Sequence, residues 1–224
     1  MVWKNVNMIK CDNVNCYVIR GDKGDVLIDT SIKKYRNEIE TWLLNYDIKL
    51  IALTHGHNDH IENAAYFAEL FNVPVVMHKD DEALAKDNLC RGFYAAGISG
   101  TICGVLSQKT MGIQADTFEI TRYITDGDII GEEAGVEIKV VSLPGHTRGS
   151  LGFYHNGDFY VGDAVFNYIY PSFPYVCESP SESRKSIEKI HTFRPKRLFF
   201  GHGEPLTTGH NKKYINLFSK NIIM

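Results

Sequence analysis

The chain has 224 residues, 44% of them hydrophobic, and a formal net charge of −3 at pH 7. This length and composition predict one globular domain over residues 1–224, and no apolar run is long enough to cross a membrane. Basic residues are spread along the chain, which argues against a nucleic-acid partner, and no signal-peptide pattern opens it, which favours a cytoplasmic protein.

The five cysteines are odd in number and form no Cys-x-x-Cys motif. Reduced thiols in a cytoplasmic protein are therefore expected instead of a disulfide framework. Cys11 and Cys16 could still pair or bind a metal, and the alternative is that both are small buried hydrophobic residues.

Hydrophobic periodicity predicts strands and helices in alternation along the first half of the chain. A hairpin with a glycine-rich turn over residues 21–24 comes first, and a segment with helical spacing follows it. The predicted ranges in order are strands 16–20 and 25–29, helix 35–44, strand 49–53, helix 61–70 and strand 73–77.

The second half repeats this order loosely. Asn156, Gly157 and Asp158 form a predicted turn between two strands, and Pro180 marks a helix start. The predicted ranges are strands 137–142, 150–155 and 159–161, a helix from 180 to 191, strand 197–200 and helix 212–219. This alternation favours an α/β protein.

Residues 54–60 read Thr-His-Gly-His-Asn-Asp-His, which puts three imidazoles and a carboxylate within six positions. The motif lies between a predicted strand and a predicted helix, where sites of α/β proteins often occur. His55 and His57 can point the same way from an extended loop, while Asp59 and His60 fall in the first helical turn. Imidazole and carboxylate groups suit zinc, and the two directions favour a site for two metal ions.

Three later segments share one pattern, a predicted strand that ends in a potential ligand residue beside a glycine. Glycine lets the backbone pass close to a ligand because it has no Cβ atom. The three residues at these strand ends are His146, Asp163 and His202.

These seven residues, in this order, resemble the ligand set of the metallo-β-lactamase-fold metallohydrolases, over roughly residues 10–205. The resemblance implies a four-layer αββα sandwich, in which two mixed sheets are flanked by helices. It also implies that one metal ion is held by His55, His57 and His146, and a second by Asp59, His60 and His202, with Asp163 bridging both. Asp29, which follows the strand-like run 26–28, resembles the carboxylate with which the family orients a ligand histidine.

The resemblance implies two zinc ions, with iron or manganese as alternatives, and a metal-bridging hydroxide as nucleophile. Asp59 would orient this hydroxide, and the small-molecule substrate would be an ester, a thioester or a lactone. The chain is similar to glyoxalase II through Gly162-Asp163-Ala164-Val165-Phe166, although Glu62-Asn63 replace its Gly-Gly pair. Only 22 residues follow His202, so the C-terminal glutathione-binding region of that enzyme is expected to be missing.

Two alternatives stay open. A mononuclear-iron sulfur dioxygenase would use the same fold for redox chemistry, although Asn167-Tyr168-Ile169-Tyr170 replace the Gly-Arg-x-Asp stretch of those enzymes. The other alternative is a non-catalytic binding module, against which the intact set of seven residues argues.

Two segments interrupt the regular alternation. Residues 86–118 are predicted to be an insertion that covers the active site or forms a homodimer contact, or else a plain surface loop. Residues 166–175 are rich in aromatic residues, so Phe166 and Tyr168 could form an apolar substrate wall or belong to the core. Arg148 could meet an anionic substrate or be solvated.

Overall fold

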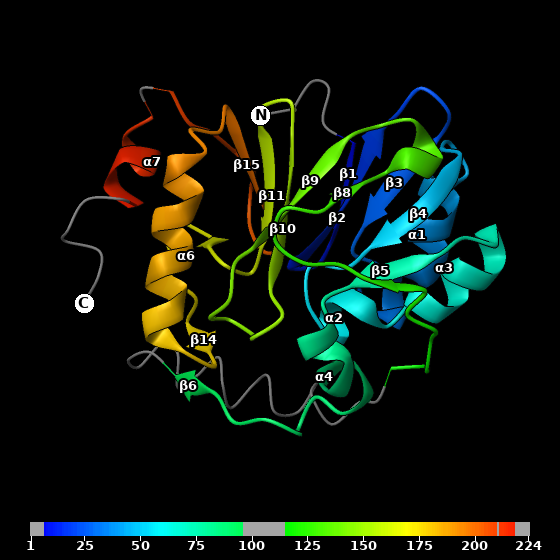
Figure 1. Cartoon of the computed structure of the whole chain (residues 1–224), viewed down its shortest axis with the longest axis horizontal. Helices are drawn as coiled ribbons and strands as arrows, with labels where there is room; N and C mark the ends of the chain where they lie inside the picture. Colours follow the sequence, from blue (N-terminus) through cyan, green and yellow to red (C-terminus); the bar gives the residue numbers. More distant parts are fainter. Residues whose placement is uncertain (1–6, 96–114, 210, 218–224) are drawn as a thin grey trace.

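The computed structural model describes residues 7–95, 115–209 and 211–217. Two six-stranded sheets lie face to face, and helices cover their two outer faces (Figure 1). This is the four-layer αββα sandwich that the sequence predicts.

The first sheet has the strand order β1-β2-β3-β4-β5-β7. It is mixed, because β1, β2 and β3 pair antiparallel whereas β3, β4, β5 and β7 run parallel. Helices α1 and α3 lie on its outer face, at the right of Figure 1. The elements are β1 (Met8–Cys11), β2 (Val14–Arg20), β3 (Asp25–Ile28), η1 (Lys33–Tyr35), α1 (Arg36–Leu43), β4 (Ile48–Ala52), α2 (Asn58–Ile61), α3 (Ala64–Phe71), β5 (Val75–Met77), η2 (Lys79–Asp81), α4 (Glu82–Lys86) and β7 (Arg122–Tyr123).

The second sheet has the order β16-β15-β11-β10-β9-β8, and only β11 and β15 pair in parallel. Helix α6 belongs to the segment that connects these two strands, and it lies on the outer face with α7, at the left of Figure 1. The elements are β8 (Ile129–Ile130), η3 (Glu132–Ala134), β9 (Ile138–Ser142), β10 (Leu151–His155), β11 (Asp158–Gly162), α6 (Pro180–Thr192), β15 (Arg197–Phe200), β16 (Leu206–Thr207) and α7 (Lys212–Leu217).

Three hydrophobic clusters correspond to the three interfaces between the four layers. Neighbouring residues of one strand belong to different clusters, because side chains alternate between the two faces of a sheet. In β4, Leu50 joins the cluster between the sheets, whereas Ile51 packs in the cluster that contains Phe67 of α3. The core therefore fixes both sheets, and with them the strand ends at which the predicted site residues lie.

The predicted helix over residues 61–70 is in fact two helices, α2 and α3, which are separated at Glu62 and Asn63. Asn63 accounts for this difference, since its Nδ2 atom donates to the carbonyl oxygens of Thr30, Ser31 and Ile32. The other predicted strands and helices agree with the structure to within two residues at each end, except that residues 218 and 219 lie outside the described part.

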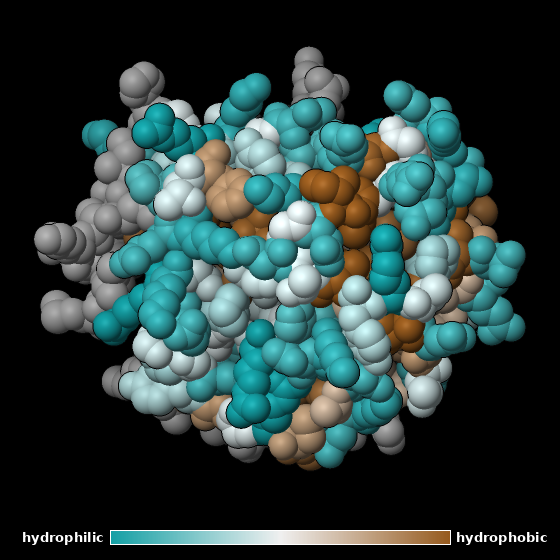
Figure 2. Space-filling model, in the orientation of Figure 1, coloured by the Kyte–Doolittle hydropathy of each residue, from teal (hydrophilic) through white to brown (hydrophobic). Residues whose placement is uncertain are grey.

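Hydrophilic side chains cover most of the face seen in Figure 2, and hydrophobic ones gather in a narrower zone near its middle. Within the described ranges, no helix combines the length and the apolar character that crossing a membrane requires. Cys11 and Cys16 are free thiols that pack as buried residues in the cluster beneath α1 and α3.

Candidate metal centre

The loops that carry the predicted metal ligands meet at one edge of the two sheets. Each loop follows the end of a strand: His55 and His57 come after β4, His146 after β9, Asp163 after β11 and His202 after β15. Asp59 and His60 lie in α2, which sits below the two sheets near the middle of Figure 1.

The side chains of these residues form three overlapping groups, in each of which the potential ligand atoms lie within 4.8 Å of one another. The groups are His55–His57–His146, His55–His60–Asp163 and Asp59–His60–His202. The structure thus brings together all seven side chains that the sequence singled out, although they come from four separate segments.

Hydrogen bonds to the backbone orient two of the histidine rings. Nδ1 of His146 donates to the carbonyl oxygen of Val176 (2.8 Å), and Nδ1 of His202 donates to that of Asn13 (2.8 Å). Because their Nδ1 atoms point at these carbonyl oxygens, the Nε2 atoms of both rings face the centre. His57 differs from these two rings, because it turns Nδ1 towards the centre. This Nδ1 atom lies 2.9 Å from Nε2 of His146.

Asp29 orients the rings of His60 and His55 through their Nδ1 atoms. Its Oδ2 accepts hydrogen bonds from Nδ1 of His60 (2.9 Å) and from the hydroxyl of Thr54 (2.8 Å). The hydroxyl oxygen of Thr54 also lies 3.0 Å from Nδ1 of His55. Asp29 therefore holds His60 directly and His55 through Thr54, and the structure places it where the sequence predicted an orienting carboxylate.

Asp163 lies between the histidine groups and is buried. Its Oδ2 is 3.4 Å from Nε2 of His146 and 3.2 Å from Nε2 of His202. Its Oδ1 is 3.5 Å from Nε2 of His60. One carboxylate thus reaches both halves of the centre, which is the geometry of a shared ligand.

The charges of the centre shift the histidine pKa values in opposite directions. Burial lowers the pKa of His60, but the carboxylates of Asp163 and Asp59 outweigh it and raise this pKa to about 10. Burial and the neighbouring ring of His146 lower the pKa of His57 to about 3. The half of the centre that contains Asp59, His60 and Asp163 therefore attracts positive charge. The half around His57 offers neutral imidazole.

Two buried atoms of the centre, Nε2 of His55 and Oδ1 of Asp163, have no hydrogen-bond partner among the described residues. Leaving such an atom unpaired costs about 1–3 kcal/mol. Ring nitrogens also face each other, at 2.9 Å between His57 and His146 and at 3.4 Å between His60 and His202. Ring nitrogens at such distances can share a proton or hold a metal ion between them. The residues therefore fit a pair of divalent metal ions, and their imidazoles and carboxylates suit zinc, iron or manganese.

The sequence did not reveal the groups that orient the ligands, apart from Asp29. The carbonyl oxygens of Asn13 and Val176 hold two histidines, but a backbone carbonyl leaves no mark in a sequence. Thr54 directly precedes His55, and this position is the only feature of the sequence that could have indicated its orienting role.

The predicted substrate residues lie in different surroundings. The ring centroid of Phe166 is 5.2 Å from that of His202 and 5.9 Å from that of His146. The ring of Tyr168 is 6.0 Å from that of His202, and this residue is 45% exposed. The Arg148 side chain is 73% exposed, and its Nε atom lies 3.3 Å from Oε2 of Glu178. The structure thus brings the two aromatic residues to the centre and leaves Arg148 at the surface.

The segment 86–118, predicted to be an insertion, is described only in part, since residues 96–114 lie outside the described ranges. Its roles as a cover or as a homodimer contact therefore stay predictions. In the described part, β6 (Tyr94–Ala95) pairs antiparallel with β14 (Val176–Cys177). Residues 166–175 contain a second small ladder, β12 (Phe166–Asn167) with β13 (Pro171–Ser172).

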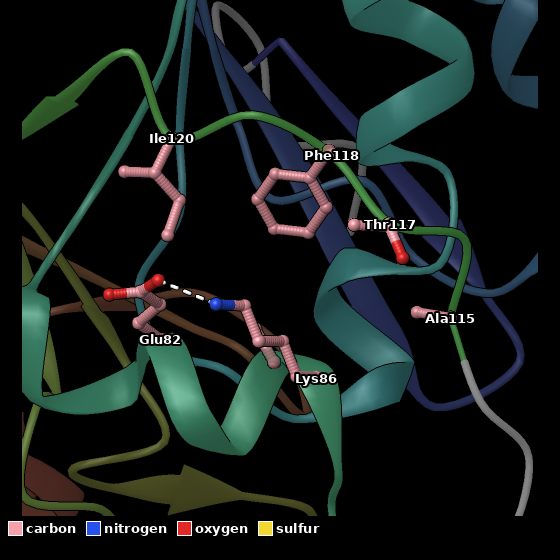
Figure 3. A pocket seen from close by; sticks show the side chains of 7 residues that line it. Glu82, Lys86, Ala115, Thr117, Phe118 and Ile120 are labelled. Atoms are coloured by element: carbon pink, nitrogen blue, oxygen red, sulfur yellow. Dashed lines mark hydrogen bonds and ion pairs between the residues drawn. The ribbon is translucent and has the colours of Figure 1, made fainter.

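A pocket beside α4 is built from other residues. In Figure 3, the side chains of Phe118 and Ile120 face α4, where Nζ of Lys86 lies 2.6 Å from Oε1 of Glu82. None of its lining residues belongs to the seven-residue cluster; they are Glu82, Ala85, Lys86, Ala115, Thr117, Phe118 and Ile120. Its mostly apolar lining does not offer a metal site.

Comparison with known proteins agrees with this geometry. The family model of the metallo-β-lactamase superfamily matches residues 9–202. The chain belongs to this superfamily. Among its relatives in the superfamily, an uncharacterized protein of Aquifex aeolicus is 27% identical over 205 residues, which cover 90% of either chain. A hydroxyacylglutathione hydrolase of Halorhodospira halophila is 24% identical over 73% of this chain and 56% of its own length.

Solved structures of the superfamily share the fold. The B3 metallo-β-lactamase BLEG-1 superposes with a TM-score of 0.69 at 20% identity, over 91% of this chain and 93% of its own. The protein TTHA1623, solved in a di-iron-bound form, superposes with a TM-score of 0.64 at 22% identity, over 89% of this chain and 92% of its own.

Proposed function

We propose that the chain is a dinuclear-metal hydrolase that cleaves a small ester, thioester or lactone. The observation that carries this proposal is the position of Asp163, whose Oδ2 atom lies 3.4 Å from Nε2 of His146 and 3.2 Å from Nε2 of His202. A carboxylate shared by two groups of histidines suits two metal ions better than one. Membership of the superfamily supports hydrolysis, and the relative that hydrolyses a hydroxyacylglutathione supports an acyl substrate.

Two divalent ions bound here would supply a nucleophile from water at neutral pH and polarise the substrate carbonyl. Asp59 is suited to orient the attacking water, since its side chain is 39% exposed whereas that of His60 is fully buried. Burial raises the pKa of Asp59, but His60 and His202 outweigh it and hold this pKa well below its ordinary value. Asp59 therefore stays ionised and accepts a hydrogen bond from water throughout the neutral range.

Phe166 and Tyr168 would form the apolar side of the substrate site. Their rings lie against His202, at centroid distances of 5.2 Å and 6.0 Å. Aromatic side chains beside a polar reactive centre are the usual lining of a small-molecule site. Zinc is the metal that five histidines and two aspartates suit best, and the di-iron form of a structural neighbour supports iron as the alternative.

The test is to measure the metal content of the purified chain and then its activity on esters, thioesters and lactones. Two zinc ions per chain and turnover of at least one substrate are expected. Asp163→Asn should lower turnover by about 100-fold or more, because the shared carboxylate loses its charge. The control is Asp158→Asn, which changes the carboxylate at the other end of β11, where it pairs with Arg197, and should leave metal content unchanged.

Other outcomes would contradict the proposal. One iron per chain together with oxygen consumption would indicate the sulfur dioxygenase. Full metal content without turnover of any substrate would favour a binding module. Equal activity of the Asp163→Asn variant and the unmodified chain would refute the role of the shared carboxylate.

A further inference from the structure

Asp81 is a fully buried carboxylate that joins two loops of the metal centre. It lies at the end of η2, directly before α4. Its Oδ2 accepts hydrogen bonds from the backbone N–H of Gly56 (3.1 Å) and from the hydroxyl of Thr147 (2.6 Å), and its Oδ1 accepts one from the N–H of Gly149 (3.0 Å). One side chain thus links the loop after β4 to the loop after β9.

These two loops carry the histidines of one group in the centre. Gly56 stands between His55 and His57, and Thr147 follows His146. The three histidines share a group whose ligand atoms lie within 4.8 Å of one another. Asp81 itself does not belong to any of the three groups, so it contributes to the centre through the backbone of its neighbours.

Two glycines leave the space that Asp81 occupies. A Cβ atom at Gly149 would lie 2.6 Å from Cγ of Asp81, and a Cβ atom at Gly56 would lie 2.8 Å from the carbonyl oxygen of Asp81. Both distances are shorter than real Cβ contacts. The backbone N–H groups therefore reach Asp81 only because neither position has a side chain.

Asn88 holds the first loop at a second point. Its Oδ1 accepts a hydrogen bond from the N–H of Asn58 (2.7 Å), and its Nδ2 donates to the carbonyl oxygen of Gly56 (3.0 Å). His57 therefore lies between two residues whose backbone is anchored. The helix between Asp81 and Asn88 is packed firmly, since Ala85 of α4 belongs to the core cluster beneath the first sheet.

Arg91 balances the charge of the buried carboxylate. Its guanidinium group lies 3.3 Å from Oδ1 of Asp81 and 2.8 Å from Oε1 of Glu178. The N–H of Glu178 in turn donates to the carbonyl oxygen of His146 (3.0 Å). The second loop is thus held by Asp81 and by the backbone of Glu178, and Arg91 pairs with the carboxylates of both residues.

We propose that Asp81 is a positioning residue, which sets the spacing between the loop of His55 and His57 and the loop of His146. This inference rests on the proposed dinuclear centre and assigns to Asp81 the control of metal affinity at one of its two positions. In the described part of the chain, Asp59, His60 and His202 donate no hydrogen bond to Asp81, whose donors belong to the loops of the first position, so we expect the second position to be independent of it.

The test is the variant Asp81→Asn, which keeps the size of the side chain but sets an amide group against N–H donors. The affinity for one of the two zinc equivalents should fall about ten- to hundredfold, while that for the other stays unchanged. The measurement is a zinc titration of the metal-free chain against a chromophoric chelator. Excess zinc should restore turnover in this variant.

Thr147→Val is the milder second variant, because it removes the 2.6 Å hydroxyl contact and leaves the pair of Asp81 with Arg91. It should weaken the same zinc equivalent by a smaller factor, and it decides the question if Asp81→Asn does not fold. The matched control is Asp25→Asn, a buried carboxylate at the start of β3 that accepts a hydrogen bond from the N–H of Asp47 (2.9 Å). It should keep both zinc equivalents.

Three results would overturn this inference. Unchanged zinc affinities in Asp81→Asn, or in Thr147→Val if only that variant folds, would show that the link does not set the spacing. An equal loss at both positions would indicate general loosening of the fold, especially if Asp25→Asn showed it too. An unmodified chain that binds no zinc would refute the dinuclear centre itself, and the inference with it.

Discussion

Gly201 and Asp163 lie in contact where β15 and β11 end side by side, and a Cβ atom on Gly201 would overlap Oδ1 of Asp163. The same Cβ atom would lie 2.8 Å from Cε1 of His60. The place of Asp163 between the two halves of the centre therefore depends on a residue without a side chain in the neighbouring strand end.

Gly201→Ala should displace the carboxylate of Asp163 and lower zinc affinity about ten- to hundredfold. The added methyl group also overpacks the site, at a cost of about 1–3 kcal/mol in the free energy of unfolding. Zinc titration and denaturant unfolding measure the two effects separately. Gly92→Ala is the control, because a Cβ atom there meets no heavy atom of the described residues within 4 Å. Equal zinc affinity of Gly201→Ala and the unmodified chain would contradict this prediction.

Thr54→Val should lower turnover about tenfold, since it removes the hydroxyl that lies between Asp29 and His55. Valine matches threonine in shape, so the strand end should keep its backbone hydrogen bond to Asp29. Steady-state kinetics at saturating zinc is the measurement. Thr41→Val, in an exposed threonine whose hydroxyl bonds within α1, serves as the control. Turnover that Thr54→Val leaves unchanged would mean that His55 needs no such support.

Zinc uptake by the metal-free chain at pH 7.5 should release about two protons from histidine rings, because metal-bound histidine is neutral, and about one more from the water that the metal ions activate. The pKa of His60 is raised to about 10, and that of His202 is also raised, as Asp163 outweighs the effect of burial. Both rings are therefore positively charged in the metal-free chain at this pH, with a proton on each of the two ring nitrogens. Calorimetry in buffers with different ionisation enthalpies counts the protons, and release of none would contradict the assigned charges.

The raised pKa of His60 also predicts how the stability of the metal-free chain depends on pH. A histidine whose pKa is raised on folding contributes stability fully below its unfolded value of about 6.5. For His60 this contribution is lost as the pH rises towards about 10. The metal-free chain should therefore lose stability across this window, whereas the zinc-loaded chain should not. Thermal unfolding of both forms as a function of pH is the test, and a metal-free chain that gained stability would oppose it.

Tyr168→Ala should raise KM several-fold and leave kcat nearly unchanged, because the residue is 45% exposed and its ring lies 6.0 Å from that of His202. The comparison is Tyr94→Ala, a tyrosine of similar exposure (55%) in β6. Only the first variant should alter KM. Equal KM values for both variants would remove Tyr168 from the substrate site.

The four inner strands of each sheet could be predicted, because apolar runs mark buried strands, but the edge strands β1, β7, β8 and β16 were missed. The meeting of the seven side chains was implied by the resemblance to the metallo-β-lactamase-fold family, with three of them at predicted strand ends. The break between α2 and α3 could not be predicted, since Asn63 reaches carbonyl groups about 30 positions earlier in the chain. Asp81 was also missed, because two of its four partners are backbone N–H groups and all of them lie far from it in the sequence. Sequence reveals which side chains meet more readily than it reveals which backbone groups hold them.

The hydrogen bond from His202 to Asn13 joins residues that are 189 positions apart. A ribosome releases the N-terminal part of the chain well before it has made His202. During translation the group of Asp59 and His60 therefore lacks its third member, His202, until that residue has been made. The position that includes His202 can be completed only after the chain has been synthesised through residue 202.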